Sequence, residues 1–471
     1  MTRNQRGKGG NKQSKRKGQD ARSLALETLM NILEEGAYAN IAVNERLQQS
    51  HLKGPDRGFF TELVYGTTRT VNTLDWALAH FLKKDLARFT PAIRNVLRLG
   101  AYQLLYLERV PSRAAVHQSV ELAKAYGHQG VAALVNGVLR NLLRRQEEVV
   151  FPDLEEEPIR HIALKYSHPE WLVDRWVAEF GVEDTIRLCR YNNTSSPLTL
   201  RVNTLKTTRE ELTMKLAARG IEAKESSYAP EGLIVEQWPG LEEVEEFSEG
   251  LFLMQDESSM LVAHALKPDQ GATVIDACAA PGTKTTHLAQ LMENRGEIWA
   301  VDVHRHKLGL IQENSRRLGI SIIQTRLGDA RELLQVVEQR ANYVLVDAPC
   351  SGLGVLGRRA DARWRKTPEQ VAAMPDLQLA ILKGGAEAVA DGGVLVYSTC
   401  SIAPEENQGV ISRFLADNPD FRLEDLTGFL PAVVMRKEDR ELVRQGMLQI
   451  LPQVHGIDGF FMARLRKNKR G

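Results

Sequence analysis

From about Gly271 onward, short apolar runs alternate with glycine-rich turns and helical stretches. The expected strands are Thr273–Ala277, Glu297–Val303, Ile320–Thr325, Tyr343–Asp347 and Val394–Tyr397, and the stretches His306–Leu318 and Leu377–Ala390 are typical of helices. Strands covered on both faces have continuous apolar sequences, and helices between successive strands make parallel crossovers. The alternation therefore predicts an α/β fold with a doubly wound, mostly parallel sheet.

The region before this sheet has other periodicities. From about Ala21 to Glu148, apolar residues recur at helical spacing, which predicts a compact bundle of helices. The faces that carry this pattern are Leu26/Leu29/Met30/Leu33, Phe60/Leu63/Val64, Ile93/Val96/Leu97, Val116–Leu122 and Ala133–Arg145. The next part of the chain mixes helical and strand signals. It contains an acidic linker at Asp153–Pro158, a helix from Pro169, a strand at Leu198–Asn203, a capping box at Thr208–Glu211 and a β-rich stretch at Ile221–Val235.

These patterns divide the chain into a basic arm at 1–20, an all-α domain at 21–150, linker helices with a small α+β subdomain at 151–260, and a catalytic domain at 261–471. The 471 residues are too many for one ordinary core. No apolar run is long enough to span a membrane, and the polar first 22 residues do not form a secretory signal. We therefore expect no membrane association and a cytoplasmic protein.

Net charge is uninformative at +1, but basic residues gather at both ends of the chain, in 3–17 and 464–470. Each segment is interpreted equally well as an arm that reaches phosphates or as a solvated tail. Arg140, Arg144 and Arg145, on the last helix of the bundle, are open to the same two interpretations.

The four cysteines, Cys189, Cys278, Cys350 and Cys400, lie far apart, without a CxxC pair or a zinc pattern, so we expect neither a disulfide framework nor a metal site. Burial is the ordinary interpretation for Cys189, and Cys278 is expected to line a cofactor loop without reacting. Cys350 and Cys400 differ because each follows an expected strand and lies among Pro, Ser or Gly. Ligands of such sheets bind at the carboxyl ends of the strands, so both thiols are expected to face one crevice.

The loop Ala277–Thr285 is neither a P-loop nor a GxGxxG fingerprint, yet its small residues allow a ligand to approach the backbone at a helix start. Asp302 ends the second strand and is placed to accept hydrogen bonds from ribose hydroxyls. Asp329 follows the third strand and is placed to bind an adenine amino group. A set of strand-end acids without a phosphate clamp suits S-adenosylmethionine, although any one of these acids can instead cap a helix.

Two thiols beside such a cofactor suit cytosine methylation, because C5 of cytosine is a poor nucleophile until a thiolate adds to C6. The segment Ser401–Asn407 predicts a helix that starts just past Cys400 and helps to lower the pKa of that thiol. Asp347 is placed to hold the edge of the base and to stabilise charge that develops on the ring.

Three motifs, Asp276–Lys284, Asp347–Ser351 with the following glycine, and Ser398–Ser401, resemble those of the RNA cytosine-5 methyltransferases. The segment Leu134–Asn141 resembles the RNA-binding antitermination factor NusB, and the combination is similar to the Sun (RsmB-type) branch, which methylates 16S ribosomal RNA. The resemblance extends over nearly the whole chain from Ala21, including the segment 247–259. It implies a Rossmann-like, S-adenosylmethionine-dependent methyltransferase domain behind a NusB-like bundle.

The resemblance also implies roles for individual residues. It makes Cys400 the nucleophile and Cys350 the residue that assists product release, whereas DNA cytosine-5 enzymes use a Pro-Cys thiol as the nucleophile. The cofactor positions that it implies are Cys278, Ala279, Ala280, Pro281, Gly282, Thr283, Lys284, Asp302, Asp329 and Asp347. Thr283 departs from the family, in which glycine is usual.

The expected substrate is a cytosine in a hairpin loop of 16S ribosomal RNA, since the base must be unstacked to enter the site, and the protein is expected to act as a monomer. Transfer RNA is the main alternative substrate. A non-catalytic RNA-binding or assembly factor is a second alternative, which the strand-end acids and thiols disfavour. A nucleotide-dependent oxidoreductase is disfavoured by the missing GxGxxG.

Overall fold

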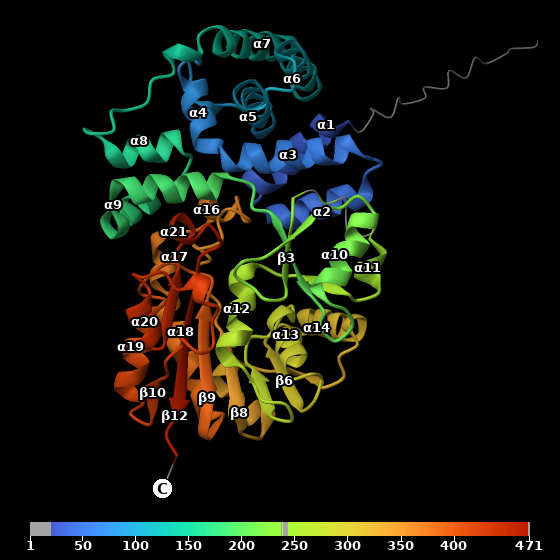
Figure 1. Cartoon of the computed structure of the whole chain (residues 1–471). Helices are drawn as coiled ribbons and strands as arrows, with labels where there is room; N and C mark the ends of the chain where they lie inside the picture. The colour runs from blue at the N-terminus through green and yellow to red at the C-terminus, as the bar shows by residue number, and fades with distance from the viewer. Residues whose placement is uncertain (1–19, 237, 239–243, 470–471) are drawn as a thin grey trace, which may run out of the picture. The chain divides into compact units, whose positions relative to one another are not determined.

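The computed structural model describes residues 20–236, 238 and 244–469 (Figure 1). The chain divides into two compact units between Ser167 and His168. The predicted basic arm lies outside the described residues apart from Asp20, whose carboxylate caps the first helix. Within the described ranges, no helix combines the length and the apolar character needed to cross a membrane.

The first unit is a helical bundle, as the periodicity predicts. Its helices are α1 (Ala21–Leu33), α2 (Ala39–Gln49), α3 (Pro55–Arg69), α4 (Val71–Ala79), α5 (Pro91–Tyr106), α6 (Ser112–Tyr126), α7 (Gln129–Arg144) and α8 (Pro158–Lys165). Helix α5 is buried around most of its circumference, and α1–α4, α6 and α7 share one core with it. Helices α2 and α4 were not predicted; α2 buries only Ala39, Ala42 and Val43 and therefore carries little apolar signal.

The second unit begins with α9 (Glu170–Asn193), which is interrupted at Gly181, and continues into a small sheet. The sheet and its helices are β1 (Leu198–Val202), α10 (Arg209–Ala218), β2 (Ala223–Glu225), β3 (Gly232–Val235), α11 (Glu245–Ser248) and β4 (Phe252–Met254). The strands pair antiparallel in the order β2-β3-β1-β4. The predicted capping box is confirmed, because the Glu211 amide donates to Thr208 Oγ1 and the Thr208 amide donates to Glu211 Oε2.

The large sheet of this unit confirms the predicted fold class. Its strands, in the order β10-β12-β9-β8-β5-β6-β7, are β10 (Phe421–Leu423), β12 (Phe460–Lys467), β9 (Val389–Thr399), β8 (Ala341–Asp347), β5 (Thr273–Asp276), β6 (Glu297–Asp302) and β7 (Ile323–Leu327), with β11 (Met447–Ile450) paired to β12. Strands β9 to β7 run parallel, and β12 runs antiparallel to β9. The chain order reverses between β5 and β8, and such a switch point opens a crevice at the carboxyl ends of its strands.

Helices cover both faces of this sheet (Figure 1). Alternate residues such as Val274 and Ile275 enter separate cores. One core holds α12 (Glu257–Leu266) and α13 (Thr283–Leu291), and the other holds α15 (Leu333–Val337), α18 (Met374–Glu387) and α19 (Gln408–Asp417). The remaining helices of the unit are α14 (Arg305–Leu318), α16 (Ala362–Arg365), α17 (Pro368–Ala372), α20 (Arg440–Arg444) and α21 (Pro452–His455). Burial on both faces explains the continuous apolar runs.

Several predicted boundaries are wrong by three to five residues, including the start of β9, which is Val389 rather than Val394, and the start of α18, which is Met374 rather than Leu377. Strand β7 begins at Ile323 rather than Ile320, because Gly319 ends α14 in a left-handed conformation and the Ile320 amide still donates to the Ser315 carbonyl. Helix α18 ends at Glu387 rather than Ala390, since β9 already pairs at Val389 with Ala341 of β8.

The basic run near the C-terminus, from Arg464 to Lys467, is neither an arm nor a solvated tail. It belongs to β12, where the buried Arg464 guanidinium donates to Glu424 and to the carbonyls of Ala265 and Leu266. Lys467 donates to the Val389 carbonyl at 3.0 Å. These cations stabilise the sheet, so neither of the two interpretations left open by the sequence applies to Arg464 and Lys467.

Candidate active site

The loop between β5 and α13 forms one wall of the crevice at the switch point. At its end, Gly282 has φ +96°, and a Cβ there would lie 3.1 Å from the Ile311 backbone, so only glycine fits. Thr283 starts α13 with helical geometry, and its carbonyl accepts a 2.5 Å hydrogen bond from Arg201 of β1. The left-handed position therefore falls at Gly282, and the unusual threonine causes no backbone strain.

Two carboxylates stand behind this loop. Asp276 is buried; its Oδ2 accepts from Thr285 at 2.7 Å, its Oδ1 has no partner, and burial raises its pKa to about 7. Asp302 is also buried, and its carboxylate accepts from the amides of Ala280 at 3.2 Å and His304 at 2.8 Å. The structure thus brings the predicted loop and Asp302 together, with Asp276 as an additional acid.

Asp329 lies at the end of β7 and has local partners. Its carboxylate accepts from the Arg331 amide at 2.9 Å and forms an ion pair with the Arg331 guanidinium at 2.5 Å. These contacts cap a short 3-10 helix, and the side chain keeps about a third of its surface exposed. Asp329 still contributes negative charge to the crevice, since it raises the pKa of Cys278 together with the other strand-end acids.

The two predicted thiols meet at the carboxyl ends of β8 and β9. Asp347 pairs with Ser398 in the register of these parallel strands, so the loops that follow carry Cys350 and Cys400 to the same edge. The sulfur atoms lie 3.3 Å apart, and both side chains are half-buried. A sulfur pair at this distance shares a hydrogen bond, so one thiol donates while the other accepts.

The surroundings decide which sulfur accepts. The hydrogen bond from Cys350 is the main effect that lowers the pKa of Cys400; Arg359 and Lys284 also lower it, while burial and Asp347 oppose them. The same hydrogen bond, burial and neighbouring negative charge raise the pKa of Cys350 well above its ordinary value. The thiolate of the pair therefore resides on Cys400.

The predicted helix start just past Cys400 is wrong. Residues 404–407 form turns, and α19 begins only at Gln408. Asn407 has φ −111° and ψ −100°, outside the helical region, because its side chain bonds back to the cysteine loop. The positive charges near Cys400 are thus side chains and not a helix N-terminus.

Lys284 joins the two walls of the crevice. Its ammonium group lies 2.7 Å from Asp347 Oδ2 and 5.1 Å from the centre of the Phe460 ring. Burial alone would lower the pKa of Lys284, but the ion pair with Asp347 outweighs it and raises this pKa. The other oxygen of Asp347 accepts from Ser398 at 2.8 Å, so Asp347 is held between both walls.

Sequence reasoning missed several residues that shape this site. Glu406 is buried behind the cysteine loops, Arg359 acts on Cys400, and Arg201 connects β1 to the loop before α13. A buried glutamate in a Pro-Glu-Glu-Asn segment has no sequence signal that separates it from an exposed one. Cys189 lies in α9, away from the strand ends, and burial raises its pKa to about 12, as expected for a packing residue.

One group in the described ranges has the composition of a metal site, which the sequence did not predict. The potential ligand atoms of Glu231, His264 and His287 all lie within 4.8 Å of one another. His264 and His287 approach the Glu231 carboxylate to 3.0 and 2.5 Å, and burial lowers the pKa of His287 to about 4. Arg201 also acts on Glu231, so its positive charge already balances this buried carboxylate.

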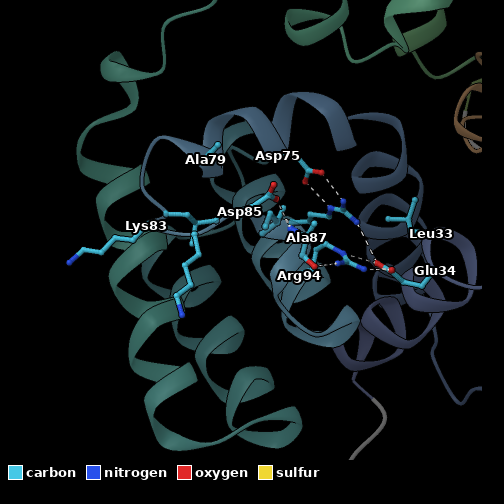
Figure 2. A pocket seen from close by; sticks show the side chains of 12 residues that line it. Leu33, Glu34, Asp75, Ala79, Lys83, Asp85, Ala87 and Arg94 are labelled. Carbon is cyan, nitrogen blue, oxygen red and sulfur yellow. Dashed lines mark hydrogen bonds and ion pairs between the residues drawn. The ribbon is translucent and has the colours of Figure 1, made fainter.

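The helical unit contains an open pocket of about 640 Å³ (Figure 2). Arg94 and Arg98 lie in it, but Arg94 pairs with Glu34, and Arg98 pairs with Asp75 at 2.7 Å. Lys83 and Lys84 remain exposed at its edge. Its charges are thus largely neutralised within the bundle, and it contains no thiol.

Comparisons with known proteins agree with this architecture. The model of the family described as 16S rRNA methyltransferase RsmB/F matches residues 263–466, that of the NusB family matches 19–144, and that of the RsmF/B-like ferredoxin-like domain matches 168–240. The chain is 42% identical to the "probable ribosomal RNA small subunit methyltransferase B" of Bacillus subtilis, over 95% of this chain and 98% of that protein.

Solved structures are also similar. The crystal structure of PH0851 shares 27% identity and a TM-score of 0.78, and the match covers 95% of this chain and 98% of that one. NSun6 from Pyrococcus horikoshii, solved with SFG, an analogue of S-adenosylmethionine, shares 27% identity and a TM-score of 0.57 over 64% of this chain and 99% of its own.

Proposed function

Because this chain belongs to the RsmB/F family of 16S ribosomal RNA methyltransferases, we propose that it methylates C5 of a cytosine in 16S ribosomal RNA through a covalent adduct with Cys400. The family makes it an S-adenosylmethionine-dependent ribosomal RNA methyltransferase. The observation that carries the cytosine-5 chemistry is the 3.3 Å contact between Cys350 and Cys400 at the carboxyl ends of neighbouring strands. A methyltransferase that acts on a nucleophilic nitrogen or oxygen has no need of such a pair.

The crevice fits S-adenosylmethionine. The backbone of Cys278–Gly282 forms a wall without bulky side chains, Asp302 has lone pairs left for ribose hydroxyls, and Asp276 Oδ1 is a buried acceptor without a partner. S-adenosylmethionine supplies an electrophilic methyl group on a positively charged sulfur. The carboxylates of Asp302 and Asp329 make this wall negative and so favour a cation.

Cys400 begins the reaction because it is the sulfur that holds the negative charge. Its thiolate forms a bond to C6 of the cytosine, and the electron pair displaced from the C5–C6 double bond makes C5 nucleophilic. After methyl transfer, a base removes the proton from C5, the double bond re-forms and the Cys400–C6 bond breaks. Cys350, whose sulfur is 3.3 Å from that of Cys400, is in reach of the breaking bond and assists this release.

Asp347 and Lys284 act on the base. Asp347 ends β8 beside the thiols, where its carboxylate can accept from the exocyclic amino group of cytosine. The Lys284 ammonium, 2.7 Å from Asp347, stabilises both this carboxylate and negative charge that develops near Cys400. Together they orient the ring so that C6 faces the attacking sulfur.

The substrate cytosine must leave its stack, so a hairpin loop suits the site better than a duplex. We propose that the helical domain at 21–150 binds the surrounding RNA through exposed cations such as Arg140 and Arg144, that the subdomain at 151–260 supports the catalytic domain at 261–471, and that the protein acts in the cytoplasm as a monomer. The NusB-family match over 19–144 supports the RNA-binding role.

Trapping the adduct tests the chemistry. The Cys350→Ala variant, incubated with S-adenosylmethionine and 16S ribosomal RNA, is expected to accumulate a covalent RNA–protein complex that survives denaturing electrophoresis. Cys400→Ala is expected to form neither complex nor product, while Cys189→Ala, which alters a buried cysteine of α9, should match the wild type. An adduct in the Cys400→Ala variant would contradict the assignment.

Bisulfite sequencing of the treated RNA identifies the substrate. Naked 16S ribosomal RNA, isolated 30S subunits and total transfer RNA are offered in separate reactions to the wild-type protein. We expect a 5-methylcytosine in 16S ribosomal RNA; methylation confined to transfer RNA would overturn the proposed substrate but leave the thiol chemistry intact.

A further inference from the structure

Glu406 lies in the turns between β9 and α19, and its side chain is completely buried. Its carboxylate accepts hydrogen bonds from the Ser351 amide at 2.8 Å, from Ser401 Oγ at 2.7 Å and from Gln378 Nε2 at 2.8 Å, and also from the Ser351 hydroxyl. Ser351 and Ser401 directly follow the two crevice cysteines, and their hydroxyl oxygens lie 3.0 Å apart. One carboxylate thus connects the loop of Cys350 with the loop of Cys400.

The backbone around this carboxylate is fixed by further hydrogen bonds. The Tyr397 hydroxyl, on β9, donates to the Glu406 carbonyl at 2.6 Å. The neighbouring Asn407 accepts from Thr399 at 2.6 Å and donates to the Ser401 carbonyl at 3.0 Å. Gln378, on α18, donates to the Pro349 carbonyl at 3.0 Å as well as to Glu406. The residues on either side of both cysteines are therefore held by one polar network.

The donors to Glu406 are all neutral, and no ion pair of Glu406 is formed in the part of the chain that the structure describes. Burial of a carboxylate without a countercharge costs desolvation free energy, which several hydrogen-bond donors must offset. Four donors satisfy its oxygens here, and its negative charge acts on the Cys350 thiol.

The hydrogen bond with Cys400 and burial are the main effects that raise the pKa of Cys350, and negative charge on Cys400, Glu406 and Asp347 raises it further. The Tyr397 phenol, whose pKa is raised by burial, supplies no opposing charge. On the other side of the pair, Arg359 and Lys284 lower the pKa of Cys400. The charged groups around the two sulfurs thus favour a proton on Cys350 and a negative charge on Cys400.

We propose that Glu406 is a positioning residue that ties the two cysteine loops together and, through its charge, keeps the shared proton on Cys350 so that Cys400 attacks. The proposal rests on the proposed function of the two cysteines. Glu406 touches neither substrate nor cofactor, and it acts through Ser351 and Ser401. It explains how two thiols in contact acquire different protonation states.

Glu406→Gln tests both parts of the proposal, because it removes the charge while keeping the size of the side chain. The rate of iodoacetamide labelling of each cysteine is measured by peptide mass spectrometry between pH 5 and pH 10 on the folded protein, without RNA. In the wild type, Cys400 should be labelled with a lower pH midpoint than Cys350. In Glu406→Gln, the midpoint of Cys350 should fall by about one pH unit and the gap between the two should narrow.

The same variant is assayed for methyl transfer. We expect kcat to fall about 10- to 100-fold, since displaced cysteine loops misalign the attack, while KM for S-adenosylmethionine stays within about twofold. Glu405→Gln is the matched control: Glu405 is the adjacent glutamate, is half-exposed and pairs with Arg175, and its variant should equal the wild type in both assays. Glu406→Asp, which restores the charge, should recover the labelling gap better than Glu406→Gln.

Each outcome decides a part of the proposal. A kcat within twofold of wild type in Glu406→Gln overturns the tie between the loops, and a lowered kcat with an unchanged labelling gap overturns the role of the charge. If Glu406→Gln does not fold, Ser401→Ala removes a single hydroxyl from the network and should still lower kcat several-fold; wild-type kcat there also overturns the tie. The labelling assay contains no RNA, so it succeeds or fails independently of the proposed substrate.

Discussion

The crevice has two halves that act differently on a cysteine although they lie at the same edge of one sheet. The half at β5, β6 and β7 contains Asp276, Asp302 and Asp329; burial raises the pKa of the Cys278 thiol there, and these acids raise it further. The half at β8 and β9 contains Cys400, whose pKa is lowered by the Cys350 hydrogen bond and by Arg359 and Lys284. A cysteine in the first half is thus inert and one in the second is reactive, so strand-end position alone does not make a nucleophile.

The difference suits the two ligands. A negative half attracts a cationic sulfonium and binds hydroxyl and amino groups, whereas a half with positive side chains stabilises a thiolate and the charge that it passes to a base. Lys284 is the residue in which the halves meet, because it starts in the cofactor loop and ends on Asp347. Removal of the Lys284 side chain should therefore reduce the difference between the two halves more than any other substitution considered below.

Lys284→Met is expected to give the largest effect. It deletes a cation near Cys400 and leaves the Asp347 carboxylate without its ion pair, so kcat/KM should fall on the order of 10²- to 10³-fold at pH 7. Because the pKa of Cys400 rises when this cation is lost, part of the activity should return as the pH increases. Steady-state methyl transfer between pH 6 and pH 9.5 measures both.

Lys383→Met serves as the control for this change, since Lys383 lies partly exposed on α18 and pairs with Asp417. If Lys284→Met instead raised KM for S-adenosylmethionine and left kcat unchanged, Lys284 would belong to the cofactor half and the comparison would have to be redrawn.

Asp276→Asn is expected to change the pH dependence of stability. Burial raises the pKa of Asp276 to about 7, above the ordinary value of 3.8. The folded state therefore retains a proton that the unfolded state loses, and this residue makes the protein less stable as the pH rises from about 4 to about 7. Asparagine removes this loss, so the stability gained relative to wild type should be about 2–3 kcal/mol greater at pH 8 than at pH 5.

Urea denaturation of both proteins at the two pH values checks this expectation. Asp391→Asn, at an exposed position of β9, is the control and should leave the pH dependence unchanged. An equal change in stability for Asp276→Asn at pH 5 and pH 8 would show that Asp276 is already ionised in the folded protein at pH 5, and that it adds a negative charge to the acidic half.

Asp302→Ala should affect the cofactor half alone. The loss of a charged acceptor for ribose hydroxyls should raise KM for S-adenosylmethionine roughly 10- to 30-fold, with a smaller change in kcat and with the iodoacetamide reactivity of Cys400 unaltered. Asp417→Ala, an exposed acid on α19, controls for charge. A lowered reactivity of Cys400 in Asp302→Ala would mean that the two halves are electrostatically coupled.

The sequence predicted the strand ends that border the crevice well and the surroundings of the thiols only in part. Apolar runs that end in Asp302 or Asp347 are strong signals, because buried parallel strands and their carboxyl ends follow from local patterns. The apolar Ile320 was assigned to a strand, although it belongs to the cap of α14. Arg464 was expected at the surface, since a basic residue has no local mark that it will bond to the carbonyls of Ala265 and Leu266.

The protonation of the thiol pair could not be predicted from local sequence patterns either, because it depends on tertiary contacts. It depends on Glu406 and Arg359, which come near the sulfurs only when β8 and β9 pair and the loops fold back. The predicted helix start past Cys400 offered a local source of positive charge, but the side chains of Glu406 and Asn407 bond to the cysteine loops and the helix begins later.

Thr283→Gly should give the smallest effect and shows how much freedom the cofactor half retains. Glycine is usual at this position in the family that the chain resembles, but here the left-handed backbone falls at Gly282 and Thr283 is the first residue of α13. Glycine at a helix start loses more conformational entropy than threonine, so the free energy of unfolding should drop by less than about 1 kcal/mol. The hydrogen bond from Arg201 uses the backbone carbonyl and is kept, so the loop should hold its shape and KM for S-adenosylmethionine should change less than about threefold.

Thermal unfolding and cofactor titration measure the two quantities, with Thr283→Ser as the conservative control. A large rise in KM would mean that the Thr283 side chain itself contacts S-adenosylmethionine. The loop of the acidic half would then bind the cofactor through this side chain and not through its backbone alone.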